Sequence, residues 1–156
     1  MQIKNKVRVS TFWLLSIFMM NALSAEPQDI TFGHGKVKFV GQSKTINVEV
    51  AITKAQINRG LMYRESLDQE SGMLFINDQQ EILKVWMKNT LIPLDIVFIS
   101  QQGAIVGFIN ALQPCVQVPC EIYDSPEPAK YMLELNIGMI LNKNLKIGGK
   151  ALFFIE

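Results

Sequence analysis

Alternation of apolar and polar side chains marks the clearest element of the chain, in the segment TINVEVAI at residues 45–52. Every second residue from Ile46 to Ile52 is apolar, and Asn47 and Glu49 lie between them. Successive side chains of a strand point to opposite faces, so this pattern predicts a strand over 46–52 with one buried face. Directly after it, Thr53 and Gln56 match a helix capping box, and a glycine follows at position 60. We therefore expect one short helix over about 54–60.

The rest of the chain is divided into short apolar runs separated by turn residues. We expect strands over 72–77, 83–88, 93–100, 104–112, 130–137 and 151–156. Polar turns are expected at 78–81, 101–103 and 146–150, and a second short helix over 138–144. Strands this short and numerous, joined by Gly, Pro, Asn and Asp, predict a mainly β fold: a compact β-sandwich or irregular barrel with one or two short helices.

The first 25 residues follow a different pattern, with a basic start, an apolar run over 12–20 and the small residues 22–25. This is the layout of a secretory signal peptide. A membrane anchor is the alternative, but the run is shorter than the ~20 residues that span a bilayer. We therefore expect a signal peptide over 1–25, a single β domain over 26–156, and a periplasmic or secreted location.

Loss of the signal peptide changes the charge balance. The whole chain has 15 basic and 14 acidic residues, and Lys4, Lys6 and Arg8 lie in the first 25. The remainder has a net charge of −2 and no basic run. Neither nucleic acid nor an anionic membrane surface is therefore an implied partner, and we expect no stable membrane insertion after cleavage.

Two cysteines, Cys115 and Cys120, lie in QPCVQVPCEIY. In an exported protein such a close pair indicates a disulfide. A redox centre would use C-x-x-C, and a metal site would need further ligands nearby, so these are the weaker alternatives. The ring is small, and on a chain-entropy estimate it stabilises the fold by roughly 2 kcal/mol. Its expected role is to hold one loop.

Four segments together resemble a known family: RGLMYR (59–64), GMLF (72–75), VWMKNTLIPLDIVFI (85–99) and YMLELNIG (131–138). The chain is similar to the family numbered 192 among the domains of unknown function, over about residues 37–155. The resemblance implies a compact, mostly β domain that is often exported, and it implies no established reaction, cofactor or substrate. One departure is the last turn, where the family commonly has Gly-Asp and this chain has Gly148 and Gly149.

Asp95 stands at the head of an apolar strand whose two faces both look buried. A buried carboxylate must find a partner or take up a proton, and Glu134 in YMLELN raises the same question. The architectural interpretation has Asp95 tie a loop and Glu134 pair with a base such as Arg59. The functional interpretation gathers polar groups at the mouth of a pocket floored by Trp86 and methionines, where a small ligand binds. Its residues are Arg59, Trp86, Asn89, Thr90, Asp95 and Glu134.

Three methionines, Met62, Met73 and Met87, fall in the family-like segments. Thioethers are ligands for Cu(I), and the Trp86 indole could stack on a cation, so copper is an alternative cofactor. The competing interpretation is core packing, because methionine commonly fills gaps. The lone His34 lies between glycines and is interpreted as an incidental surface residue.

Catalysis has little support in the residues. No Ser-His-Asp or Cys-His arrangement has an obvious basis, and an acid–base pair of Asp95 and Glu134 would need both carboxyls in one cavity, roughly 5–9.5 Å apart. The sequence thus favours a non-enzymatic small-ligand-binding or accessory module of the cell envelope, without a cofactor. A Cu(I)-binding protein and a protein–protein interaction module that binds another envelope protein are the alternatives.

Overall fold

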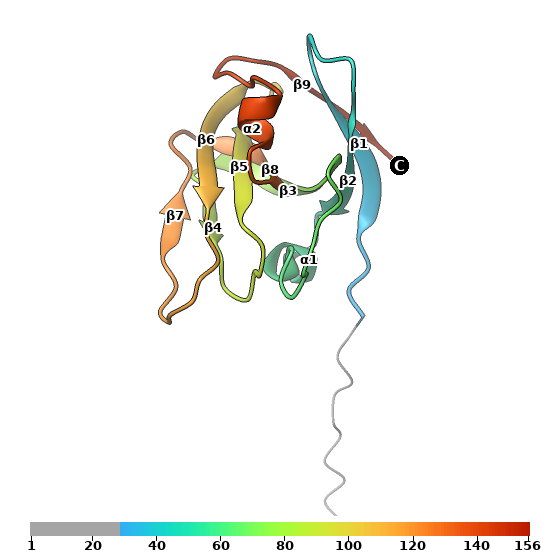
Figure 1. Ribbon diagram of the computed structural model, residues 1–156. Coiled ribbons are helices and arrows are strands. Elements are labelled where there is room, and N and C mark those ends of the chain that lie inside the picture. The colour runs from blue at the N-terminus through green and yellow to red at the C-terminus, as the bar shows by residue number, and fades with distance from the viewer. Residues whose placement is uncertain (1–28) are drawn as a thin grey trace, which may run out of the picture.

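The computed structural model describes residues 29–156, so the expected signal peptide at 1–25 lies outside the described residues. The described chain is mainly β, with two short helices (Figure 1). In chain order the elements are β1 (Gly33–Phe39), β2 (Ile46–Ala51), α1 (Lys54–Arg59), β3 (Ser71–Glu81), β4 (Lys84–Trp86), β5 (Leu94–Ile99), β6 (Ile105–Leu112), β7 (Ile122–Asp124), β8 (Ala129–Asn136), α2 (Met139–Asn142) and β9 (Ala151–Ile155).

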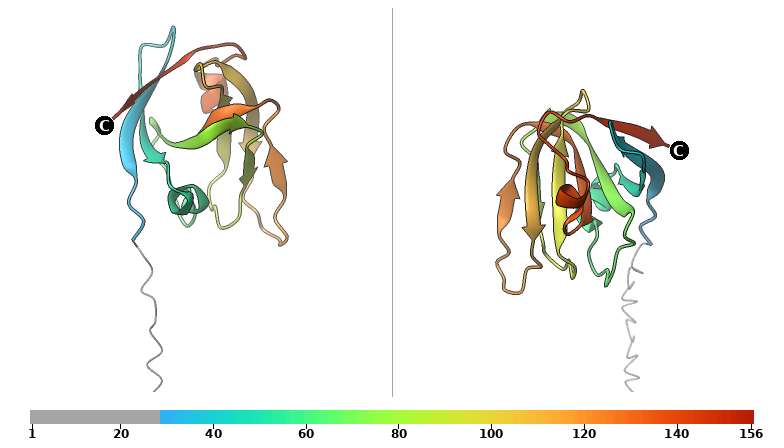
Figure 2. Two further views of the ribbon diagram at one scale, coloured as in Figure 1. Left: turned by 180° about the vertical axis from the view of Figure 1, so that it is seen from behind. Right: turned by 45° about the horizontal axis from the view of Figure 1, so that its top comes forward.

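Seven strands form one strongly curled sheet in the order β6-β5-β8-β3-β2-β1-β9, and β4 pairs with β7 in a separate ribbon. Neighbours are antiparallel except β2 and β3. The two edges of the large sheet meet at one end, where the Ile105 amide donates to the Gly149 carbonyl and the Gly148 amide donates to the Ile105 carbonyl, each at 2.8 Å. The sheet is therefore a half-barrel, closed where β9 crosses toward β6 (Figure 2).

The central strands are buried on both faces, and all six residues of β5 are inaccessible. One core joins strands from both halves of the curled sheet and is completed by Met139 and Ile140 of α2. The other lies on the opposite face of β3, β8 and β5, where the β4–β7 ribbon and the segment that follows α1 cover it. This double burial explains why the central strands read as continuous apolar runs.

The structure confirms the mainly β class, the strand after residue 45 and the capped helix. Gln56 accepts from the Thr53 amide at 2.9 Å through its side chain, and Thr53 accepts from the Gln56 amide at 3.3 Å. The half-barrel corresponds to the irregular barrel rather than to the sandwich. A disulfide joins Cys115 and Cys120 as expected. Neither helix among residues 29–156 has the length and apolar character of a membrane span.

Two element predictions were wrong, and two strands were missed. Residues 78–81, expected as a turn, belong to β3, because their backbone continues to pair with β8 after an irregularity beyond Ile76. Of the strand expected over 83–88, only Lys84–Trp86 is extended, as β4. The strands β1 and β7 were not predicted: in GHGKVKF two glycines hide the alternation, although Val37 and Phe39 are buried. Gly35 is required there, since a Cβ would lie 2.8 Å from the Phe154 carbonyl oxygen.

Candidate functional site

A cavity of about 290 Å³ opens between the segment that follows α1, the strand β4 and the sheet face formed by β3 and β8. Its walls are mainly apolar, with Leu61, Phe75 and Met132 among them. Two of its polar groups, Thr90 and Glu134, are buried, whereas Arg59 and Lys84 belong to exposed positions. Its remaining lining residues are Ile57, Asn58, Gly60, Met62, Val85, Trp86 and Ile122.

The chain turns sharply into the cavity wall at the end of α1. Gly60 ends the helix with a φ of 45°, a conformation in which side chains are disfavoured. An added Cβ would also lie 3.3 Å from the Phe75 ring. The turn delivers Leu61 into the core, where it is 2% exposed. The glycine in RGLMYR is therefore needed for both the direction and the closeness of this wall.

Two residues with left-handed backbone conformations link the loops beside the cavity. Tyr63 has a φ of 66° and Asn89 a φ of 56°. The Tyr63 amide donates to the Asn89 carbonyl at 2.8 Å, and the Asn89 side-chain amide donates to the Tyr63 hydroxyl at 2.7 Å. Non-glycine residues in this region are strained, and such strain clusters at functional sites. Asn89 is thus a clamp between loops and is not among the cavity-lining residues.

A row of residues crosses the sheet beneath the cavity. Strand register places Glu49 opposite Met73, Met73 opposite Glu134, and Glu134 opposite Ile96. Directly opposed side chains share one face of a sheet, so all four point to the cavity side. Arg64 pairs with Glu49 through two hydrogen bonds, one of them 2.7 Å from Nη2 to Oε2. This contact lowers the pKa of Glu49 and raises that of Arg64.

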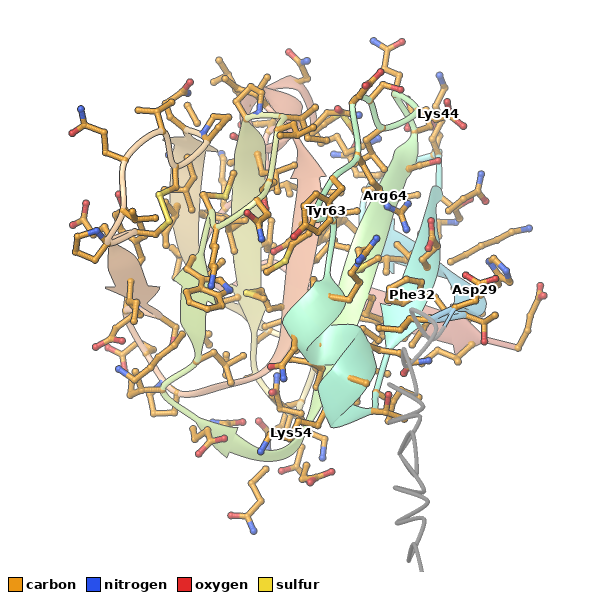
Figure 3. The ribbon with its side chains drawn as sticks, turned by 90° about the horizontal axis from the view of Figure 1, so that it is seen from below. Asp29, Phe32, Lys44, Lys54, Tyr63 and Arg64 are labelled. Atoms are coloured by element: carbon orange, nitrogen blue, oxygen red, sulfur yellow. A yellow bond between two sulfur atoms is a disulfide. The ribbon has the colours of Figure 1, made fainter. Side chains whose placement is uncertain are left out.

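Beside the cavity, the start of the described chain borders a wider groove, to which Arg59, Gly60 and Met62 also contribute. Figure 3 views the molecule from below and shows Tyr63 and Arg64 close together on the side of the sheet that is turned toward the viewer, with Phe32 on the same side. The Arg64 guanidinium carbon lies 5.7 Å from the Phe32 ring centre. The ion pair with Glu49 and this aromatic contact hold Arg64 in place.

Glu134 is the most perturbed carboxyl of the site. It is 7% exposed, and no described residue hydrogen-bonds to its carboxyl oxygens. These oxygens keep some exposure to the cavity, because no fully buried side-chain oxygen of residues 29–156 lacks a partner. Burial raises the pKa of Glu134 to about 8, against the opposing influence of the Arg64 charge. With a pKa of about 8, the Glu134 carboxyl is mostly protonated at pH 7, and in that form it can donate one hydrogen bond and accept another.

The charges at the mouth differ in how they are balanced. Lys84 pairs with Asp124 at 2.7 Å. The Lys88 ammonium lies 5.2 Å from the ring centre of Trp86, whose side chain is 42% exposed. The Arg59 guanidinium carbon lies 4.9 Å above the Tyr63 ring, and no acid of the described residues pairs with it. The expected pair of Arg59 and Glu134 is therefore wrong.

Four of the six expected pocket residues line this cavity: Arg59, Trp86, Thr90 and Glu134. Asp95 does not. It shares a face with Val97 and Ile99, as expected, but its two carboxyl oxygens accept from the amides of Ala111 and Ile140, each at 2.9 Å. Arg59, Asn89 and Thr90, which were expected to gather with Asp95 in one pocket, do not bond to it, because this face turns away from them.

An acid–base pair of Asp95 and Glu134 is also excluded by register. Glu134 lies opposite Ile96 in the pairing of β8 with β5, and Asp95 lies opposite Leu135. A displacement of one residue along a strand moves a side chain to the other face. The two carboxyls consequently point to opposite sides of the sheet.

The methionines expected as copper ligands separate in the structure. Met73 and Met87 are 0% and 2% exposed and belong to the core beneath the cavity. Met62 lines the cavity, with its sulfur 4.0 Å from the Asn89 side-chain nitrogen. Within residues 29–156 no three His, Cys, Asp or Glu side chains gather in a metal-binding group. Copper binding stays a prediction that no observation here favours.

Sequence reasoning did not assign Arg64, Glu49 or the apolar walls to the site. Glu49 was expected on a solvent face, yet it is half-buried under Arg64. The signal was present in RGLMYR, whose second arginine follows the helix by a few residues. This arginine could be assigned to the site only with the knowledge that β2 lies beside β3, and β3 beside β8.

Comparison with known proteins identifies relatives of the chain. The family model described as DUF192, an uncharacterized ACR, matches residues 36–153. A crystal structure of a candidate transcription regulator from Sinorhizobium meliloti 1021 is 31% identical, with a TM-score of 0.74 over 80% of this chain and 97% of that one. A protein of unknown function from Novosphingobium aromaticivorans DSM 12444 is 29% identical, with a TM-score of 0.67 over 75% and 83%. No curated protein matched the chain.

Proposed function

The chain belongs to the uncharacterised family DUF192, and on that premise we propose its function from the cavity: an exported module of the cell envelope that binds a small molecule without transforming it. The observation that carries this proposal is Glu134, a buried carboxyl that faces a mainly apolar cavity and has no described hydrogen-bond partner. Ligand sites are typically apolar hollows with a few converging polar groups. A strongly perturbed carboxyl in such a hollow marks a candidate site.

The arrangement supports binding better than catalysis. Glu134 has no second carboxyl beside it in the cavity, since Glu49 is held by Arg64 and Asp95 faces the other side. A single acid can orient a ligand by hydrogen bonding. We therefore assign Glu134 to recognition and propose no reaction and no cofactor.

Export is supported by two independent features. The first 25 residues have the layout of a cleavable signal. The disulfide between Cys115 and Cys120 is of a kind that persists in oxidising compartments. The S. meliloti relative is described as a candidate regulator of transcription, but residues 26–156 have a net charge of −2 and no basic run, which does not favour DNA as a ligand.

Native mass spectrometry of the protein recovered from the periplasm tests ligand binding. We expect a stoichiometric organic adduct on the wild type. Ile57 lines the cavity, so Ile57→Trp should fill it and abolish the adduct. Val40→Trp is the matched control, because Val40 is exposed and lies outside the cavity lining. An adduct that survives Ile57→Trp, or a bare chain in every sample, contradicts the proposal.

Intact mass of the recovered protein tests export separately. A full chain produced with a functional secretion system should appear as residues 26–156, two hydrogens lighter than the reduced form because of the disulfide. A change of the small residue before the expected cleavage point, Ala25→Arg, should leave an uncleaved precursor. Recovery of unprocessed wild-type chain from the cytoplasm would refute the localisation.

A second candidate, the protein-interaction module, is favoured by the edge strand β9. Leu152 and Phe154 are exposed, and neither charge nor proline interrupts ALFFI. Apolar edge strands pair readily with another strand. Sedimentation velocity at rising concentration would show self-association of the wild type that Phe154→Lys removes. A monomer throughout would rule out a second copy as the partner.

A further inference from the structure

The charges around the cavity mouth leave one cation free to meet a ligand. Lys84 is neutralised by Asp124, and Lys88 is not among the residues that line the cavity. Arg59 has only the Tyr63 ring as a partner among the described residues. A guanidinium at the rim, bordering an apolar interior, favours an anionic group at this place.

The floor of the same cavity favours an uncharged group. The charged groups that surround Glu134 are Arg59 of α1, Arg64 after α1, and Lys84 of β4. The strands on either side present only Met73 and Ile96 in its row. With Glu134 in its neutral form, nothing on the floor compensates a ligand cation. Arg59 opposes one, whereas Arg64 and Lys84 are balanced by Glu49 and Asp124.

We infer, on the premise of the proposed function, that the ligand is an amphipathic organic anion: its acidic group stays at the mouth beside Arg59, and a carbonyl or similar acceptor at its uncharged end accepts a hydrogen bond from the Glu134 carboxyl. The apolar stretch between them lies against Leu61, Phe75 and Met132. The competing ligand is an amine that takes the Glu134 proton and sits as an ion pair. It would have to displace that proton close to Arg59, the cation at the mouth that no described acid balances.

Trp86 offers a direct readout. The chain has two tryptophans, Trp13 and Trp86, and residues 26–156 retain Trp86 alone, which lines the cavity. Its fluorescence is followed during titration with 7-oxooctanoate, octanoate and octylamine, which have chains of one length. We expect saturable fluorescence changes with both acids and no change with octylamine. The oxo acid should bind more tightly, because the carbonyl at its uncharged end can accept a hydrogen bond from Glu134.

Two variants separate the ends of the ligand. Arg59→Gln should weaken the binding of both acids by about three- to tenfold, since a partly exposed charged hydrogen bond is lost. The preference for the oxo acid should remain. Glu134→Met should remove that preference and leave octanoate affinity nearly unchanged. Lys54→Gln, a cation of the same helix outside the cavity lining, is the control and should change neither.

The outcomes distinguish this inference from its premise. If octylamine binds tightly and neither acid binds, the inference that the ligand is an anion is overturned, while the cavity remains a small-molecule site. No response to any of the three overturns the inference, while the adduct measurement decides the premise by itself. Arg59 lies on an exposed surface, so Arg59→Gln retains the fold, and unchanged acid affinities in that variant would also refute the assignment, whether or not Glu134→Met folds.

Discussion

Two buried carboxyls, Glu134 and Asp95, have opposite chemistry although they lie on adjacent strands. Asp95 accepts two backbone hydrogen bonds, from Ala111 and Ile140, and so ties the end of β6 to α2. Glu134 has no such donor and faces a cavity. Satisfied buried acceptors stabilise the fold, whereas the desolvation of the Glu134 carboxyl costs stability when that group ionises. The architectural interpretation thus fits Asp95, and the functional one fits Glu134.

The raised pKa of Glu134 predicts how stability depends on pH. Its pKa moves from 4.5 in the unfolded chain to about 8 in the folded one. Between these values the unfolded state has released the proton and the folded state keeps it. The contribution of Glu134 to stability is therefore greatest below pH 4.5 and is lost as pH rises to 8. Glu134→Gln lacks this loss. The variant should gain on the order of 5 kcal/mol relative to the wild type across that window.

Urea unfolding of both proteins at pH 5, 6.5, 8 and 9 measures the effect. The free-energy difference between variant and wild type should widen up to pH 8 and then level off. Parallel profiles over the whole range would show that Glu134 is already ionised in the folded protein. The difference between the two proteins removes the contribution of every other titrating group.

Asp95→Ala should leave the buried amides of Ala111 and Ile140 without an acceptor. We expect a loss of about 2–4 kcal/mol in the free energy of unfolding, and about half of it for Asp95→Asn, which keeps one oxygen. Adducts at the cavity should persist in both, because Asp95 lies on the other face of the sheet. Loss of the adduct with full stability would instead make Asp95 a site residue.

At the scale of elements, close approach between strands decides the geometry beneath the cavity. Gly72 in β3 lies where a Cβ would be 2.7 Å from the Glu134 carbonyl oxygen and 2.9 Å from a Leu135 methyl carbon. Both contacts are too short for real atoms, and one of them is backbone. The spacing of β3 and β8, which sets the position of Glu134, therefore depends on this glycine.

Gly72→Ala should destabilise the protein by about 1–3 kcal/mol, the usual cost of overpacking. Gly33→Ala is the matched control, since its Cβ would meet the nearest atom, Val50 Cβ, at an ordinary 3.5 Å. Thermal and urea unfolding of the two variants give the comparison. Equal small effects would mean that β3 and β8 adjust their separation freely.

At the scale of the whole molecule, the half-barrel and its covering layer form the cavity jointly. Ile57 comes from α1, Val85 from β4 and Phe75 from the main sheet. Unfolding of any of these parts would abolish the cavity. A ligand that binds there is therefore expected to stabilise the folded chain as a unit, by mass action.

With 7-oxooctanoate at a hundredfold excess over its dissociation constant, the free energy of unfolding should rise by about 2.7 kcal/mol. Ile57→Trp, which fills the cavity, should show no rise. Urea unfolding with and without the acid provides the measurement. Equal stabilisation of both proteins would locate the bound acid elsewhere on the molecule.

The local parts of the fold were predictable because their signals lie within a few residues. The alternation around Val48, the capping box at Thr53 and the cysteine pair at 115 and 120 each act over a short stretch of chain. The strand β1 was missed because Gly35 is required by the close approach of β9, which lies over a hundred residues further along the chain.

The site was predictable only in part for the same reason. Thr90 and Trp86 stand close together in one segment, and their place beside a pocket followed from the sequence. The pairing of Arg64 with Glu49, across 15 residues, and the isolation of Glu134 depend on which strands become neighbours. Hydrophobic pattern specifies that a strand has buried faces, but it does not specify what covers each face.

By itself, the sequence determined the mainly β class, the capped helix, the disulfide and the family, because propensity, periodicity and motif order are properties of the chain. Only the tertiary structure decided that Asp95 is anchored by backbone amides and that Glu134 stands alone in a cavity. A carboxyl's partners are set by strand register and sheet order, and these arise from the packing of segments far apart in the chain.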